Sequence, residues 1–174
     1  FRSGDIINFT IKKNLWIPQI PGYPLITIGG AIATNAHGKN AEIYGTIRNS
    51  IVEILLFNQN HGWLKLSRKK NKKIFDLTVG GLGLTGIIVK VTIKLTLIKS
   101  TNFKRKIKRF NNFFELINFL KNKSKKNLYS WHNGLDFNQC LVFESEPIKT
   151  NKLKNINKAY SKKKYPTIKL WNKF

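Results

Sequence analysis

Two glycine-rich segments carry the residue types that best suit the binding of an anionic ligand. The first, Thr27–Asn40, has the sequence TIGGAIATNAHGKN. Its Gly29–Gly30 pair would present free backbone N–H groups, which bind phosphate oxygens well. His37 and Lys39 add two polar side chains on the same short segment. The segment therefore predicts an anion site, and the simpler alternative is a glycine turn with an exposed histidine and lysine.

The second segment, Gly81–Gly86, has the sequence GLGLTG and matches the G-x-G-x-x-G pattern of dinucleotide-binding βαβ units. That pattern requires a strand before the glycines and a helix after them, so that a pyrophosphate meets the helix N-terminus. Here a β-branched strand is expected directly after Gly86. The βαβ interpretation is therefore disfavoured, and a close backbone approach to a ligand and a purely structural turn stay open.

Other chemistries lack the residues that they need. The Gly38–Lys39 pair is not a phosphate-binding P-loop, because the required spacing and the following Ser or Thr are absent. His37, His61 and His132 are far apart in the sequence and have no carboxylate partners at ligand spacing. Cys140 is the single cysteine, which excludes an intramolecular disulfide. We expect no metal site.

Local patterns predict the elements that position the first glycine segment. A capped short helix is expected to begin at Ser3 and to end near Asn14. The prolines of residues 18–24 should then hold the chain extended. A short strand over Leu25–Ile28 is expected to stop at the glycine pair, with a single helical turn over Ala31–Ala36 after it.

The second glycine segment is expected to lie between β-structures. Ile51–Phe57 and Trp63–Leu66 predict a hairpin, because two β-rich runs flank a turn sequence. Arg68–Lys73 is expected to form a basic loop, and Ile74–Thr78 one helical turn. The alternating, β-branched run Ile87–Ile98 predicts one long half-buried strand.

A new pattern begins after residue 99. Phe103–Arg109 alternates apolar and basic residues, which predicts a strand. Asn111 or Asn112 can cap an amphipathic helix that follows it. Leu128–Trp131 and Cys140–Glu144 predict two more strands. We therefore expect a domain boundary near residues 99–101, with one domain over residues 1–99 and another over residues 100–174.

The length and composition set wider limits. The chain has 174 residues, of which 41% are hydrophobic, so it can form a core. No run approaches the ~20 consecutive apolar residues of a membrane span. The chain contains no Met and opens on Phe1. We therefore expect an internal piece of a longer protein.

The net charge of +24 comes mostly from the second half of the sequence. Such a charge is compatible with nucleic acid, with anionic lipid and with a solvated surface. Basic residues beside aromatic ones, as in residues 103–110, would suit single-stranded nucleic acid. No recognised nucleic-acid-binding motif accompanies them, which favours the solvated surface.

Three segments in order, IPGYP (Ile20–Pro24), Thr27–Asn40 and TVGGLGLTGII (Thr78–Ile88), resemble the flavin-binding half of the vanillyl-alcohol-oxidase-type, or PCMH-type, FAD oxidoreductases. The chain looks most like the decaprenylphosphoryl-ribose 2′-oxidase branch of that family. The resemblance implies an α+β fold. Residues 1–99 would be the C-terminal part of a PCMH-type FAD-binding domain, and residues 100–174 would begin a substrate domain with an antiparallel sheet.

The resemblance also implies FAD as the cofactor and hydride transfer to the flavin from a secondary alcohol of a sugar, of the lipid-linked ribose type. His37 and Lys39 would be the catalytic residues, at the border of the pocket where the sugar meets the flavin. The implied cofactor-binding residues are Gly22, Thr27, Ile28, Gly29, Gly30, Thr34, Asn35, Ala36, His37 and Ile88.

Two alternatives stay open at this point. One is an aldonolactone oxidase of the arabinono- or gulono-1,4-lactone type, a cousin within the same family. The other, from a different class, is a basic nucleic-acid-binding module. The first interpretation implies a sugar or lipid-linked sugar as partner, leaves peripheral membrane association open and expects no specific nucleic acid. The compartment is not fixed, and a cytoplasmic or peripherally membrane-associated bacterial protein is the expectation.

Overall fold

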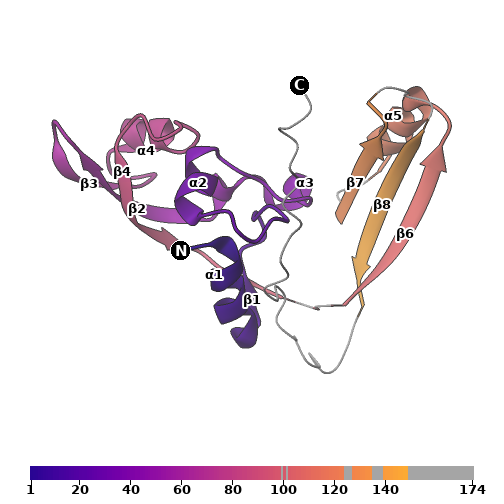
Figure 1. Ribbon diagram of the computed structural model, residues 1–174, viewed down its shortest axis with the longest axis horizontal. Coiled ribbons are helices and arrows are strands. Elements are labelled where there is room, and N and C mark those ends of the chain that lie inside the picture. The colour runs from indigo at the N-terminus through magenta and orange to yellow at the C-terminus, as the bar shows by residue number, and fades with distance from the viewer. Residues whose placement is uncertain (99, 101, 124–126, 135–138, 149–174) are drawn as a thin grey trace, which may run out of the picture.

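The computed structural model describes residues 1–98, 100, 102–123, 127–134 and 139–148. They form an α+β arrangement with antiparallel sheets, as expected (Figure 1). The helices are α1 (Ser3–Thr10), α2 (Ile28–Ala33), α3 (Ala41–Tyr44), α4 (Lys72–Thr78) and α5 (Phe113–Lys121), with short 3-10 helices η1 (Ile11–Lys13) and η2 (Ile47–Asn49). The strands are β1 (Leu15–Trp16), β2 (Ile51–Asn58), β3 (Gly62–Leu66), β4 (Ile87–Ile93), β5 (Thr96–Leu97), β6 (Phe103–Phe110), β7 (Asn127–His132) and β8 (Cys140–Pro147).

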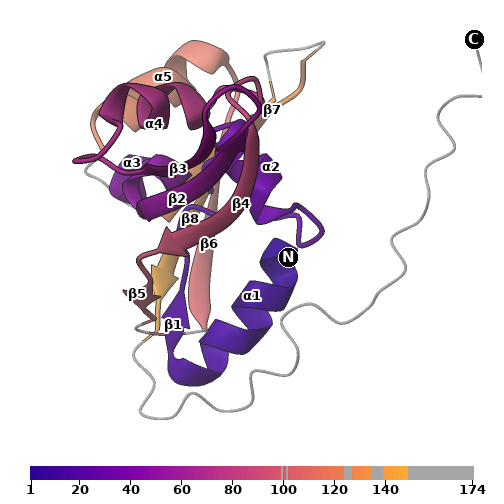
Figure 2. The ribbon, with the colours of Figure 1, turned by 90° about the vertical axis from the view of Figure 1, so that its left-hand side faces the viewer.

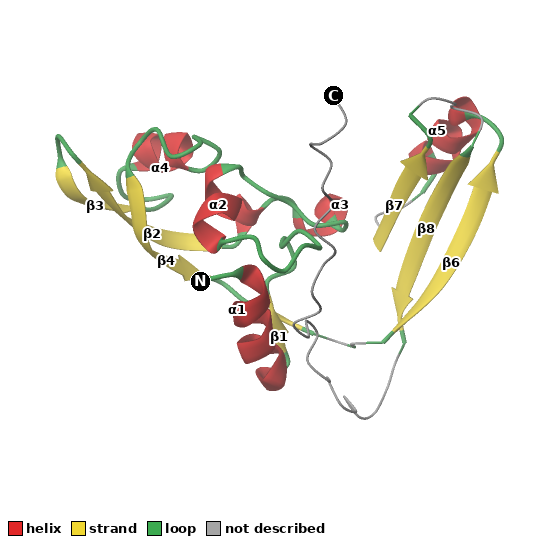
Figure 3. Ribbon diagram, in the orientation of Figure 1, coloured by secondary structure: helices red, strands yellow, loops and turns green. Residues whose placement is uncertain are grey.

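The first core lies on the three-stranded sheet β3-β2-β4 (Figure 3). Ile54 and Leu56 of β2 are fully buried, together with Phe75 of α4 and Ile32 of α2. Burial of side chains of this size contributes about 1.5–3 kcal/mol each. The same core therefore fixes both helices that border the glycine segments.

The second core lies between α5 and the sheet β6-β8-β7. Leu116 of α5 packs against Cys140 and Val142 of β8, and all three are buried. The Asn112 side chain accepts a hydrogen bond of 2.9 Å from the backbone N–H of Glu115, which starts the helix. These elements confirm the predicted strand, capped helix and strand pair after residue 99.

The hairpin prediction is also confirmed. β2 and β3 pair antiparallel, with Asn58 opposite Gly62. Between them, Asn58 Oδ1 accepts hydrogen bonds from the backbone N–H groups of Asn60 and His61, at 2.9 and 3.0 Å. His61 therefore belongs to the turn, as its place beside a glycine indicated.

The predicted strand over Leu25–Ile28 is wrong. Helix α2 begins at Ile28, so Gly29 and Gly30 lie in its first turn rather than before it. The reason is that Thr27 caps this helix: its Oγ1 accepts a hydrogen bond of 3.0 Å from the N–H of Gly30. The predicted turn over Ala31–Ala36 is therefore only the second half of the helix and its C-terminal cap.

The predicted long strand over Ile87–Ile98 is divided in two. β4 pairs with β2, but β2 begins at Ile51, so β4 has no partner strand beyond Ile93. The chain then changes partner, and β5 pairs with β1 through Leu97 and Leu15. Periodicity alone cannot reveal such a change of partner, because both parts keep an alternating pattern.

The segment before α2 folds back on α1 instead of running straight. Turns occur at residues 18–19 and 24–25. The N–H of Gly4 donates to the Pro24 carbonyl oxygen at 2.9 Å, and the Ser3 hydroxyl donates to the same oxygen at 3.2 Å. Ser3 is thus used for this contact, and no side chain caps α1. The prolines shape a bend here, contrary to the predicted extended segment.

The predicted basic loop and the single helical turn after it also differ from the structure. α4 begins at Lys72, so the helix takes the last two residues of the predicted loop.

Among the described residues, no helix is long and apolar enough to cross a membrane.

Gly86 generates a prediction about stability. Its φ is +136°, and a β-carbon there would collide with the Phe57 carbonyl oxygen of β2. Gly86→Ala should therefore lower the free energy of unfolding by about 2–4 kcal/mol, through steric overlap and backbone strain. Gly62→Ala is the matched control: φ is +64°, nothing lies within 4 Å, and the loss should be about 1 kcal/mol. Urea titration of both variants checks this, and equal losses would contradict it.

Candidate functional site

The C-terminal end of α2 is closed by a main-chain motif. The N–H of Ala36 donates to the Ala31 carbonyl at 2.8 Å, and the N–H of Asn35 donates to the Ile32 carbonyl at 3.0 Å. Asn35 has a φ of +47°, which is the left-handed conformation that such a helix end requires. Asparagine adopts this conformation more readily than most residues. The motif turns the chain toward His37.

The second glycine segment lies directly against this helix end. The N–H of Gly80 donates to the Ile32 carbonyl at 3.0 Å, and the N–H of Leu82 donates to the Ala33 carbonyl at 2.9 Å. These bonds satisfy carbonyls that the end of a helix leaves without partners. The two glycine-rich segments, far apart in the sequence, therefore form one surface.

Part of the second segment serves packing rather than a ligand. A β-carbon on Gly81 would overlap the Leu77 carbonyl oxygen, and one on Gly86 would overlap β2. A strand, β4, follows the segment immediately. The βαβ dinucleotide interpretation is therefore wrong, and the structural turn explains these two glycines.

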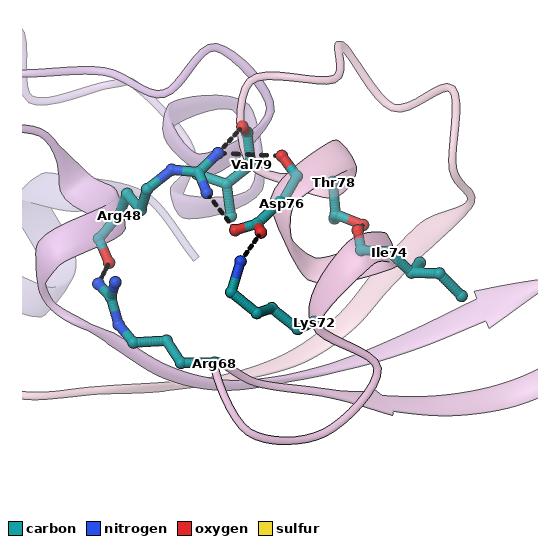
Figure 4. Close-up of polar contacts among 7 residues, drawn as sticks. All are labelled: Arg48, Arg68, Lys72, Ile74, Asp76, Thr78 and Val79. Atoms are coloured by element: carbon teal, nitrogen blue, oxygen red, sulfur yellow. Dashed lines mark hydrogen bonds and ion pairs between the residues drawn. The ribbon is translucent and has the colours of Figure 1, made fainter.

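Arg48 holds this surface in place (Figure 4). Its guanidinium donates to Asp76 Oδ1 at 2.7 Å, to the Asp76 carbonyl at 3.0 Å and to the Val79 carbonyl at 2.8 Å. The Arg48 carbonyl in turn accepts a hydrogen bond of 2.6 Å from Arg68. Since Val79 lies two residues before Gly81, the guanidinium fixes the backbone just before the second glycine segment begins.

Asp76 is held as a carboxylate. Lys72 donates to its Oδ2 at 2.6 Å, and Arg48 pairs with its Oδ1. The hydrogen bond from Lys72 is the main cause that lowers the pKa of the Asp76 carboxyl, and the positive charge of Arg48 acts in the same direction. The carboxylate is therefore ionised well below neutral pH.

The N-terminal end of α2 keeps donor capacity for a ligand. The N–H of Ile28 donates to the Phe1 carbonyl at 3.1 Å, and the N–H of Gly30 donates to Thr27. Gly29 lies between them, and a β-carbon built there would meet nothing within 4 Å. A bulky anionic group can therefore come close to the backbone at Gly29.

Asn35 gives a second sign of a ligand. Its Oδ1 is buried and has no hydrogen-bond partner among the described residues. A buried acceptor without a partner is costly, by about 1–3 kcal/mol. Oδ1 belongs to the surface where the two glycine segments meet, since Gly80 faces the Asn35 β-carbon. A large cofactor with N–H or O–H donors would satisfy it, so these residues fit FAD.

His37 and Lys39 follow on the same loop, and both are exposed. His37 Nδ1 lies 3.1 Å from the Gly38 carbonyl oxygen. Gly38 itself is tightly enclosed, because a β-carbon there would come within 3.0 Å of the Pro18 carbonyl. The Lys39 ammonium lies 4.0 Å from the ring centre of Tyr129 on β7, which is a cation–π contact.

A pocket of about 290 Å³ opens beside Lys39 and extends to the sheet β6-β8-β7. Both parts of the described chain contribute to it. The lining residues are Trp16, Pro18, Ile20, Gly22, Lys39, Asn40, Phe103, Arg105, Asn127, Tyr129 and Ser145.

The structure brings most of the predicted site residues together on and after α2, from Thr27 to Lys39. Gly22 and Lys39 line the pocket, whereas His37 is not one of its lining residues. The hydroxyl of Thr34 donates to the Gly30 carbonyl at 2.9 Å. The other predicted cofactor contacts are limited by packing, since the side chains of Ile28 and Ile88 belong to the first core.

Sequence reasoning missed the residues that come from a distance. Arg48 and Asp76 are 28 positions apart, and Arg105, Asn127 and Tyr129 reach the pocket from another sheet. The one available signal was the alternation in β6, which places Arg105 on the face opposite to that of its lysine neighbours.

Comparison with known proteins gives a family match for the first part of the chain. Residues 2–67 match the family model described as "FAD binding domain". This match confirms the resemblance to PCMH-type FAD oxidoreductases for that part of the chain, and FAD as the cofactor of the domain. The matched residues include the whole first glycine segment and α2.

Three relatives illustrate the range of similar proteins. Decaprenylphosphoryl-beta-D-ribose oxidase of Mycolicibacterium smegmatis is 34% identical over 57% of this chain and 22% of the relative. D-lactate dehydrogenase of Archaeoglobus fulgidus is 36% identical over 48% of this chain and 20% of the relative. Mitochondrial L-galactono-1,4-lactone dehydrogenase of Arabidopsis thaliana is 34% identical over 38% of this chain and 11% of the relative. The chain thus spans at most about a fifth of the length of these relatives.

The Arg48–Asp76 pair generates a prediction about pH. Because the pKa of Asp76 is lowered in the folded state, the stability that the pair contributes is present above the unfolded pKa, about 3.9, and is lost as the pH falls through the lower folded value. Asp76→Asn should therefore be less stable than the parent at pH 6, and the difference should shrink below about pH 4.

Urea midpoints of both proteins between pH 6 and pH 2.5 measure this difference. Glu42→Gln, an exposed residue of α3, is a control for the loss of one negative charge. If the difference in urea midpoint between Asp76→Asn and the parent stays constant over this pH range, the ion pairing of Asp76 is contradicted.

Proposed function

We propose that the protein containing this chain is an FAD-dependent oxidoreductase that oxidises a secondary alcohol of a sugar, of the lipid-linked ribose type, by hydride transfer to the flavin. The main observation that supports this proposal is the match of residues 2–67 to an FAD-binding domain. The arrangement around α2 supports it, since both glycine segments meet at a helix end where the buried Asn35 Oδ1 has no hydrogen-bond partner among the described residues.

Within this proposal, the residues of α2 and its flanks hold the cofactor. The N–H of Gly29 would be available to the pyrophosphate, and the open backbone at Gly22 would allow close approach. Asn35 Oδ1 accepts a hydrogen bond from the cofactor. The remaining contacts are made by Thr27, Ile28, Gly30, Thr34, Ala36, His37 and the backbone of Ile88.

When bound, FAD supplies the acceptor for the hydride that leaves the carbinol carbon, and the alcohol becomes a ketone. The hydroxyl proton needs a base at the same time. If His37 Nδ1 carries its proton toward the Gly38 carbonyl, Nε2 is the acceptor nitrogen and can take that proton. The Lys39 ammonium then stabilises the negative charge that develops on the oxygen.

The organisation of the chain is part of the proposal. Residues 1–99 form part of the FAD-binding domain, and residues 100–174 begin the substrate domain. The separate cores of the two sheets support this division. A sugar or lipid-linked sugar would then meet the flavin between them, and the similarity to a decaprenylphosphoryl-ribose oxidase favours this substrate class.

The aldonolactone alternative keeps specific support. The chain is 34% identical over 67 residues to a protein named L-galactono-1,4-lactone dehydrogenase. This alternative uses the same cofactor surface and differs only in the substrate. Steady-state rates with a sugar alcohol and with a 1,4-lactone separate the two.

Gly29→Ala tests the cofactor surface. In the free protein the change should be neutral or stabilising by up to about 1 kcal/mol, because alanine favours a helix and the β-carbon meets nothing. Affinity for FAD should fall about tenfold or more, since the β-carbon lies where the pyrophosphate approaches. Gly134→Ala, also open and on the second part of the chain, is the control. Titration of the full-length apoprotein with FAD measures the affinity of both variants. An unchanged affinity of Gly29→Ala would overturn the assignment of Gly29 to the cofactor surface.

Lys39→Ala tests the catalytic role. The rate of flavin reduction by substrate should fall about 100-fold, because one charge that stabilises the developing oxyanion is lost. FAD content should stay normal. Lys65→Ala, an exposed lysine of β3, should reduce flavin at the parent rate. Stopped-flow absorbance measures this rate, and a parent-like rate for Lys39→Ala would remove it from the catalytic residues.

A further inference from the structure

Three side chains form a row across the second sheet. Arg105 on β6 is opposite Ser145 on β8, and Ser145 is opposite Asn127 on β7. Residues directly opposite in antiparallel strands share one face, with β-carbons about 5 Å apart. This face is the one opposite α5, because Cys140 and Val142 point toward that helix and alternate with Ser145. All three residues of the row line the pocket.

The pocket around this row is positively charged. Arg105 and Lys39 give the pocket two positive charges, and none of the described residues that line it is acidic. Ion pairs of the described residues involve neither cation. Lys39 is held in place by the ring of Tyr129, which itself stacks on Phe143 at 4.8 Å. The Lys39 ammonium is therefore oriented, and neither positive charge is neutralised by an ion pair among the described residues.

Asn127 adds a different requirement. Its Oδ1 is buried and has no hydrogen-bond partner in the described part of the chain. A carbonyl oxygen accepts hydrogen bonds and repels anions, so it needs an O–H or N–H donor. An inorganic anion without protons, such as sulfate, would pair with Arg105 and leave this oxygen without a hydrogen-bond donor.

We infer that the row Arg105–Ser145–Asn127 is a subsite for a hydroxyl-bearing organic anion, a phosphorylated or carboxylated polyol. The anionic group pairs with the Arg105 guanidinium, whose fork suits phosphate and carboxylate oxygens. A hydroxyl of the same molecule donates to Asn127 Oδ1. This inference rests on the proposed function and deepens it, because it assigns the substrate a negative charge and so disfavours a neutral lactone.

The walls of the pocket agree with a small polyol. Trp16, Phe103 and Tyr129 give it aromatic surfaces, against which the C–H faces of a sugar can pack. Its volume of about 290 Å³ is at the small end of ligand pockets. A pentose or hexose phosphate is of suitable size.

Calorimetric titration of the full-length, flavin-loaded protein tests the subsite. The probes are ribose 5-phosphate, D-gluconate, sulfate (which carries no proton at neutral pH) and the neutral L-galactono-1,4-lactone. Arg105→Gln should weaken the binding of ribose 5-phosphate or D-gluconate about tenfold and leave the lactone unchanged. If Arg105→Gln weakens the binding of ribose 5-phosphate, the subsite recognises a phosphate group, and if it weakens the binding of D-gluconate, the subsite recognises a carboxylate group. Raised salt should reduce the difference.

Two variants control the result. Lys104→Gln removes the same charge from the neighbouring position, which lies on the α5 face of the same strand, and should bind the probes as the parent does. Asn127→Ala should lower the preference for ribose 5-phosphate over sulfate, because the acceptor for the hydroxyl is gone.

Each outcome decides a different claim. A protein that holds no flavin refutes the proposed function. A flavin-loaded protein whose Arg105→Gln and Lys104→Gln variants bind both organic anions with the same affinity refutes the subsite alone. The subsite is also refuted if Arg105→Gln weakens the binding of the lactone as much as it weakens the binding of the anions. Sulfate bound as tightly as ribose 5-phosphate refutes the role of Asn127.

Discussion

The hydrogen bonds of Arg48 are the interaction on which the rest of the candidate site depends. A single guanidinium joins η2 to the end of α4 through two main-chain carbonyls and the Asp76 carboxylate. The next residue in the chain, Gly80, then bonds to the C-terminal carbonyls of α2. Hydrogen bonds from a charged donor are stronger than those between neutral groups. The position of the second glycine segment thus follows from the position of one arginine.

The glycines divide into those required by the fold and those left for a ligand. Gly38, Gly81 and Gly86 have no room for a β-carbon, since carbonyl oxygens of neighbouring segments occupy that space. Gly22 and Gly29 have open space around them and lie at the pocket and at the start of α2. Absence of a steric reason within the chain is what makes these two glycines candidates for contact with the cofactor. Figure 2, turned by 90° from the view of Figure 1, shows α2 beside the strands of the first sheet.

The described chain joins two kinds of polar surface around one pocket. The α2 side supplies main-chain donors and Lys39, and the β6-β8-β7 side supplies the row that begins with Arg105. The contact between Lys39 and Tyr129 connects the two sides. A rigid aromatic ring can hold an ammonium group without neutralising it, so the charge stays available for an anion. This arrangement places recognition and the proposed chemistry on different elements of the fold.

Many of the helices and strands and part of the candidate site could be predicted from the sequence, because the sequence signals for them are local. The hairpin follows from two β-rich runs around a turn, the helix α5 from the cap at Asn112, and the FAD-binding segment from its glycine motifs. The break between β4 and β5, the Arg48 hydrogen bonds and the row at Arg105 could not, since each depends on a partner more than 20 residues away or on the end of a neighbouring strand. A cap such as Thr27 competes locally with strand propensity, and the packing of Ile28 and Ile32 in the core decides for the helix. The sequence alone therefore determined the type of cofactor and most of the elements, and the tertiary structure alone decided which side chains meet, because register and packing join residues that no local pattern connects.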